Sequence, residues 1–127
     1  MHKREPIESI CYLFFEMSVS NGESSKVDLE TIIEMIRDLM SSYEETQILS
    51  KREPTDSHII VNYCWKNFLK FRSVNFINAQ IDFLNEYLQK EEKELKMNML
   101  GYLAKIDGNV DEREVHFYNH IKKAWGL

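Results

Sequence analysis

Three side chains near the end of the sequence have the types and the spacing of a transition-metal site. Glu112, His116 and His120 lie four residues apart, so they share one face of a helix. Two imidazoles at this spacing bind zinc, copper or nickel, and a carboxylate can join them. The competing interpretation is a solvated polar face. An internal repeat, described below, favours that face, because the equivalent residues are polar but do not form a ligand set.

A second candidate metal site lies just before this helix. Asp107, Asp111 and Glu114 match the fifth, ninth and twelfth positions of a calcium-binding EF-hand loop, with Gly108 at the sixth. The first and third positions hold a leucine and a lysine, which supply no carboxylate, so the pattern favours a structural corner. Divalent-metal binding, as the secondary hypothesis, uses Asp107, Asp111, Glu114, His116 and His120.

The structural corner has its own sequence signals. Gly108 suits the end of the incoming helix, because glycine readily adopts a left-handed conformation. Asp111 is placed as the N-cap of the next helix, and Glu114 can complete a capping box by bonding back to it. Val110 and Val115 occupy the two positions of a hydrophobic staple. Together these features stabilise such a corner by roughly 1–2 kcal/mol.

The same arrangement occurs earlier in the chain. When Asn21-Gly22 is laid over Asp107-Gly108, cap residues fall on cap residues and apolar residues fall on apolar residues. We therefore expect two related helix–(Asn/Asp)-Gly–helix units, the first with a weaker capping box. The expected corner residues are Gly22, Ser25, Asp28, Gly108, Val110, Asp111 and Glu114.

Apolar side chains recur every three or four residues along most of the chain, and no useful period-two pattern occurs. The periodicity predicts an all-α bundle of six to seven helices. The expected helices cover about 6–21, 25–40, 57–71, 76–88, 95–106 and 111–124, with a short additional helix around Ile48 and Leu49. The charged stretch 89–96 is expected to form a turn or a solvated first helical turn.

Composition agrees with one helical domain covering residues 1–127. The chain is 43% hydrophobic and has only 4 glycines and 2 prolines, which suits long helices around one core. Cys11 and Cys64 lie within apolar helical patterns, so buried free thiols are expected. No signal peptide and no membrane-spanning apolar run is recognisable, and a cytoplasmic location without membrane insertion is expected.

The charge balance disfavours nucleic acid as a partner. The formal net charge is −5, whereas phosphate-backbone binding needs a basic face. One segment mixes aromatic and basic residues in the manner of a single-strand binder. Its helical spacing favours core aromatics flanked by solvated basic side chains, with Trp65, Phe68 and Phe71 among Lys66, Lys70 and Arg72.

The second corner resembles the signature of the TerB-like family, named for bacterial tellurite resistance. In that family an apolar helix ends in Ala-x-x-Asp-Gly-x-Val-x-x-x-Glu and a further helix follows. Ala104, Asp107, Gly108, Val110 and Glu114 fit this signature. The segment 15–28 is similar to the family's first copy, with asparagine at position 21 in place of the usual aspartate. The clear match covers about a fifth of the chain.

The resemblance implies an all-α bacterial domain of about seven helices with an acidic surface. It also implies a non-enzymatic role in stress response or protein association, and the family includes domains attached to a membrane-anchored DnaJ-like co-chaperone. A metal-linked role has been proposed for the family, and Asn21 weakens any shared acidic metal site here.

The function expected on this basis is a protein-interaction module in a stress-response or membrane-associated assembly, as a monomer or homodimer. No catalytic motif occurs: the serines suit helix caps, and no Gly-rich phosphate loop or Gly-x-Ser-x-Gly elbow is present. The alternatives are a calcium- or zinc-binding sensor or stress protein and, second, an uncharacterised enzyme.

Overall fold

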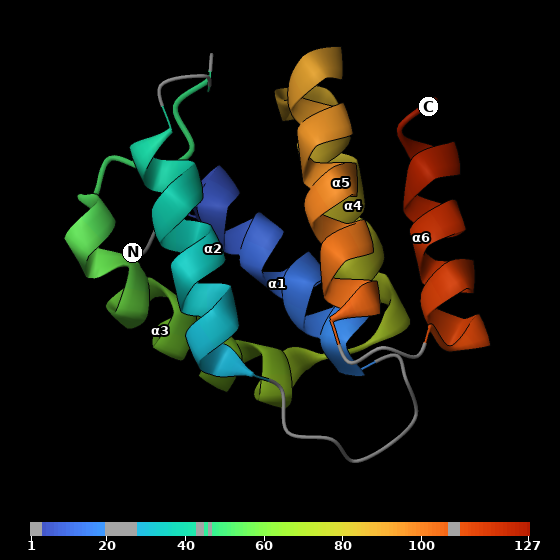
Figure 1. Cartoon of the computed structure of the whole chain (residues 1–127), viewed down its shortest axis with the longest axis horizontal. Coiled ribbons are helices and arrows are strands. Elements are labelled where there is room, and N and C mark those ends of the chain that lie inside the picture. The colour runs from blue at the N-terminus through green and yellow to red at the C-terminus, as the bar shows by residue number, and fades with distance from the viewer. Residues whose placement is uncertain (1–3, 20–27, 43–44, 46, 107–109) are drawn as a thin grey trace.

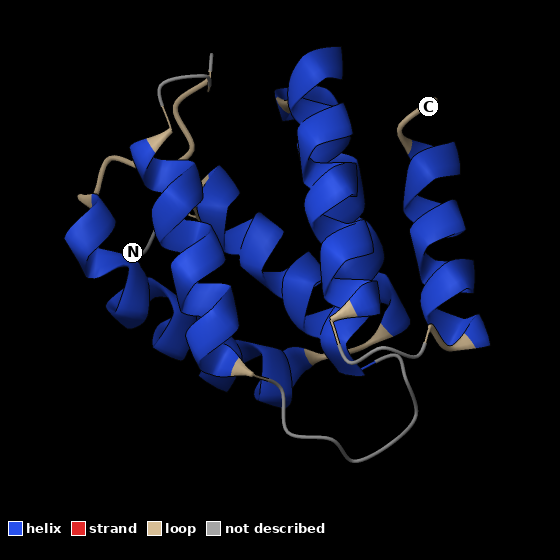
Figure 2. Ribbon diagram, in the orientation of Figure 1, coloured by secondary structure: helices blue, strands red, loops and turns tan. Residues whose placement is uncertain are grey.

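The computed structural model describes residues 4–19, 28–42, 45, 47–106 and 110–127. These residues contain six α-helices, one short 3-10 helix and no strand, which confirms the predicted all-α class (Figure 2). The elements are α1 (Pro6–Val19), α2 (Leu29–Ser41), the 3-10 helix η1 (Pro54–Asp56), α3 (Ser57–Phe71), α4 (Val74–Tyr87), α5 (Lys90–Lys105) and α6 (Glu112–Ala124).

Helix α1 forms the centre of the bundle. It packs against α2 and α3 on one side and against α4, α5 and α6 on the other (Figure 1). The predicted apolar stripe of α1 is buried, and Tyr12, Leu13 and Phe15 outside that stripe are buried as well. A helix with buried side chains on most of its sides needs other elements around it. The other helices therefore take their positions around α1.

The two expected helix–corner–helix units correspond to α1 with α2 and to α5 with α6. Their first helices, α1 and α5, pack against each other, so both units contribute to one core. The turns lie partly outside the described residues, among them Asn21, Gly22, Asp107 and Gly108. The chain also bends between α3 and α4 near the predicted position, where Ser73 caps α4 by accepting the Phe76 N–H.

Helix starts agree with the prediction in the second unit and differ in the first. Asp111 is the N-cap of α6, and Glu114 completes the capping box, as predicted. In the first unit, Asp28 is itself the N-cap of α2, where its side chain accepts the Thr31 N–H at 3.1 Å. The prediction that Asp28 completes a box begun by Ser25 is wrong, because α2 starts at Leu29. Ser25 lies outside the described residues.

The short helix predicted around Ile48 and Leu49 is absent, since residues 47–53 are not helical. Most of the hydrogen bonds of this segment go to other elements, apart from the Arg52 N–H, which donates to the Ser50 hydroxyl. The Leu49 carbonyl accepts the Ile7 N–H of α1 at 3.0 Å, and the Tyr87 hydroxyl of α4 donates to the Ile48 carbonyl. The Gln47 side chain bonds to the backbone at the end of α4. These tertiary bonds outweigh the local helical preference.

Candidate functional site

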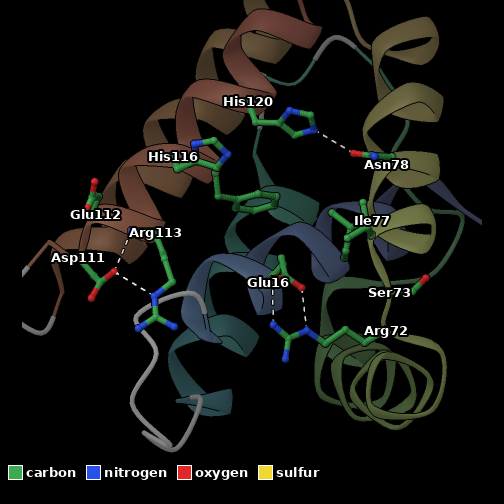
Figure 3. Close-up of a pocket in the computed structure, with 12 residues that line it drawn as sticks. Glu16, Arg72, Ser73, Ile77, Asn78, Asp111, Glu112, Arg113, His116 and His120 are labelled. Carbon is green, nitrogen blue, oxygen red and sulfur yellow. Dashed lines mark hydrogen bonds and ion pairs between the residues drawn. The ribbon is translucent and has the colours of Figure 1, made fainter.

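The candidate site is a surface pocket of about 1050 Å³ between α1, the α3–α4 turn and the start of α6 (Figure 3). Helix α6 contributes the predicted metal-site residues Glu112, His116 and His120. Asp111, the N-cap residue of α6, also lines the pocket. The rest of the lining comprises Glu16, Arg72, Ser73, Val74, Ile77, Asn78, Arg113 and Phe117.

Polar side chains in this pocket already bond to one another. The Arg72 guanidinium forms a two-point ion pair with the Glu16 carboxylate, at 2.9 and 3.0 Å. His120 Nε2 lies 2.9 Å from the Asn78 amide oxygen on α4, so this hydrogen bond joins α6 to α4 (Figure 3). These contacts in the pocket wall link α1 to the turn between α3 and α4, and α6 to α4.

The predicted metal ligands do not form a complete site in the part of the chain that the structure describes. There, no three His, Cys, Asp or Glu side chains gather in a way that could hold a metal ion. His116 and His120 both line the pocket, but His120 faces Asn78. Zinc sites generally need three or four protein ligands. Asp107, the remaining predicted ligand, lies outside the described residues.

At the corner itself, the acidic side chains have structural partners. Asp111 Oδ1 accepts the Arg113 N–H at 2.8 Å, and Glu114 Oε1 accepts the Asp111 N–H at 2.9 Å. Glu114 is also buried, with an exposed fraction of 2%. Val110 and Val115, the expected staple, each keep close to half of their surface exposed. This geometry fits the structural corner better than a cation-binding loop.

Sequence analysis missed a buried ionic cluster at the start of α5. Lys96 is only 1% exposed and forms ion pairs with Glu92, one helical turn earlier, and with Glu45 from the segment after α2. Burial raises the pKa of the Glu45 carboxyl, and the Lys96 ammonium opposes that rise. The four-residue spacing of Glu92 and Lys96 was the available signal. Their burial corrects the expectation that all of 89–96 is a turn or a solvated helical turn.

A second missed cluster joins the start of α1 to the segment before η1. Arg52 forms ion pairs with Glu5 at 2.7 Å and with the buried Glu8 at 3.1 Å. Burial acts to raise the pKa of Glu5, but hydrogen bonds from the Lys51 N–H, Arg52 and Ser50 outweigh it and lower the pKa. This cluster holds residues 50–52 against α1 and is structural.

The two cysteines meet in the core between α1 and α3. Both are free and buried, as predicted, and they lie close enough for Cys64 to affect the ionisation of Cys11. Burial, the contact with Cys64 and the nearby Glu8 carboxylate raise the pKa of the Cys11 thiol well above its usual range. A thiol that resists ionisation is a poor nucleophile, so this pair has the properties of core residues.

Helix α3 carries an unusual exposed surface. Its inner side is packed in the core, while Ile59, Tyr63 and Leu69 remain 55%, 42% and 63% exposed. Lys66 and Lys70 are also exposed and lie in line with Ile59 and Tyr63, whereas Leu69 lies about 120° round the helix from Tyr63. Of the predicted core aromatics, Phe68 is buried and Trp65 stacks on it with the ring centroids 5.5 Å apart, but Phe71 is 52% exposed, so its prediction as a core residue is wrong.

No helix among the described residues combines the length and the apolar character needed to cross a membrane. Comparison of the chain with family models, with curated proteins and with solved structures finds no match.

Proposed function

We propose that this chain is a TerB-like helical domain that acts in the cytoplasm by binding another protein and has no catalytic activity. One observation carries the proposal: Ile59, Tyr63 and Leu69 stay exposed on a helix whose opposite side is fully packed. Several exposed apolar side chains on one helix are a feature of many binding surfaces. The resemblance of the segment 103–114 to the TerB-like signature supports the same role.

The candidate pocket is consistent with a non-catalytic role. Its Arg72, Glu16, His120 and Asn78 side chains bond to each other across helices. Ser73, the hydroxyl in the lining, accepts the Phe76 N–H as a helix cap. Nucleophilic catalysis by a serine needs its hydroxyl within hydrogen-bond reach of a base and aimed at a substrate position, whereas the Ser73 oxygen is used in the helix cap. A stress-response or membrane-associated assembly is the proposed setting.

Site-specific photo-cross-linking in cells tests the proposal. A benzophenone amino acid is placed, one site per variant, at Tyr63 on α3, at Tyr102 on α5 and at Asn119 on α6, all exposed. We expect a cross-linked species containing a second protein from at least one site. Absence of any such species from all three sites, with the chain folded and expressed at its normal level, would overturn the proposed function.

A further inference from the structure

We propose that Glu45, Glu92 and Lys96 form a proton-controlled latch, which holds the segment after α2 against α5 most tightly when its two carboxylates carry one proton between them. We call this segment, residues 45 and 47–53, the strap. Docking of the strap on the bundle then takes up a proton and weakens as the pH rises. The latch operates whether or not the chain binds a partner.

The strap stays in place through contacts with other elements. Its residue Gln47 bonds to the junction of α4 and α5, where the side-chain oxygen accepts the Gln89 N–H at 2.7 Å. The Leu49 carbonyl accepts the Ile7 N–H of α1 at 3.0 Å. The described strap contains no helix, so these bonds and the ion pair of Glu45 with α5 keep it docked. A segment held in this way can open locally while the helices stay folded.

The charge of the latch favours one bound proton. Lys96 is 1% exposed and contacts both Glu45 and Glu92, whose side chains are 6% and 3% exposed. Two ionised carboxylates and one ammonium group leave one net negative charge buried, and a single proton removes it. A buried charge without compensation is costly, so such a group tends to become neutral. Glu45 Oε2 is buried and has no hydrogen-bond partner among the described residues, so nothing there stabilises a second negative charge.

The charged groups that act on Glu45 come from α5. Burial raises the pKa of the Glu45 carboxyl, Lys96 lowers it and Glu92 raises it, with a net rise. The nearby Lys93 donates to the Asn85 amide oxygen of α4 at 2.8 Å. The charged side chains of α2 and α4 are exposed to solvent, namely Glu30, Glu34, Arg37, Asp38, Asp82 and Glu86.

The other end of the strap responds to pH in the opposite direction. The Lys51 N–H and the Arg52 side chain bond to Glu5 at the start of α1, and the pKa of Glu5 is lowered. A carboxyl with a lowered pKa stabilises the docked state at high pH and loses that contribution as the pH falls. The latch, whose carboxyl has a raised pKa, loses its contribution as the pH rises. The sign of the pH response therefore shows which end is responsible.

Nuclear magnetic resonance of the full isotope-labelled chain tests the latch. The carboxyl carbon of Glu45 should titrate above the ordinary glutamate pKa of about 4.3. Hydrogen exchange of the Gln89 and Ile7 N–H groups, corrected for intrinsic rates, measures opening of the strap. We expect opening to increase by up to about tenfold per pH unit above pH ~4.3 until Glu45 is fully ionised. The Trp125 N–H, which bonds to the Ile121 carbonyl of α6, should show no such increase.

Two variants remove the shared proton from either side. Glu92→Gln pairs Glu45 with Lys96 one to one, so opening of the strap should no longer depend on pH over this range. Glu45→Gln should have the same effect from the strap side, and either folded variant suffices. The matched control Glu94→Gln changes an exposed glutamate of α5 and should keep the natural pH dependence. Circular dichroism verifies that each variant is folded.

Four results would overturn the latch. Glu45 could titrate at or below its ordinary pKa, or the Gln89 and Ile7 N–H groups could follow the Trp125 reference at every pH. The natural pH dependence could persist in a folded Glu92→Gln or Glu45→Gln variant. Finally, opening that increases only as the pH falls would assign the response to Glu5 at the other end of the strap.

Discussion

Lys96 of α5 forms an ion pair with Glu45, a residue 51 positions earlier in the chain, and both side chains are buried. Glu92 contacts the same ammonium group at 3.3 Å. One buried cation therefore serves two buried carboxylates, and one Glu45 oxygen, Oε2, has no hydrogen-bond partner among the described residues. The cluster attaches the segment after α2 to α5.

Replacing Lys96 with methionine should destabilise the protein by about 3–5 kcal/mol at neutral pH, because it leaves two buried carboxylates without a cation. Urea unfolding measures the loss. The same substitution at Lys122, which is exposed on α6, should change stability by less than about 0.5 kcal/mol. A similar small effect at both positions would contradict the buried cluster.

The pH dependence of the Lys96→Met variant provides a second measurement. Without the ammonium group, burial raises the pKa of the Glu45 carboxyl further in the folded state. When the pKa of a carboxyl is higher in the folded state than in the unfolded state, its protonation stabilises the folded protein at pH values below the unfolded-state pKa. That contribution is lost as the pH rises through the folded-state pKa. The deficit of the variant relative to the natural chain should therefore be smaller at pH 5 than at pH 8. A deficit that does not change with pH would argue that lost packing, rather than charge, is responsible.

Glu5→Gln should destabilise the protein by about 1 kcal/mol at pH 7, because Glu5 accepts charge-assisted hydrogen bonds from Arg52 and the Lys51 N–H. The pKa of Glu5 is lowered in the folded state, so its contribution is present above the unfolded pKa and is lost as the pH falls. The difference between the two proteins should therefore shrink as the pH falls below the unfolded pKa of Glu5. Thermal unfolding at several pH values measures it, with exposed Glu94→Gln as the control.

Asp111→Ala should cost about 1 kcal/mol of stability, since the side chain caps the first turn of α6. Asp111→Asn retains an oxygen acceptor and should cost much less. Asp28→Ala, at the N-cap of α2, should have an effect similar to that of Asp111→Ala. Chemical denaturation of the three variants measures the stability that the caps of α6 and α2 contribute. Equal stability of the Asp111→Ala and Asp111→Asn variants would contradict a capping role for Asp111.

The thiols of Cys11 and Cys64 should resist Ellman's reagent in the native protein and react at once after denaturation, because both are buried. The pKa of the Cys11 thiol is raised in the folded state, so folding favours the protonated form. Stability should therefore fall as the pH rises above the unfolded thiol pKa of about 8.5. Cys11→Ala should reduce this alkaline loss. Rapid labelling of the native chain at pH 7 would show that the thiols are accessible.

Local features could be predicted because short-range interactions decide them. The capping box of α6 needs only Asp111 and Glu114, three residues apart, and the structure has it as predicted. The break between α3 and α4 lies near the predicted position, but the cap at Ser73 that forms it was not predicted. The apolar periodicity likewise indicated the all-α class, because one buried stripe per helix is a property of the helix itself.

The amino-acid sequence thus determined the all-α class, the approximate extents of most of the long helices and the residues that start α6. Only the tertiary structure decided that α1 is buried on all sides, that Lys96 meets Glu45, and that His120 faces Asn78 rather than His116. It also decided which side of α3 stays exposed. Periodicity describes one helix at a time, whereas these features depend on which neighbour covers each face, and residues far apart in the chain supply that neighbour.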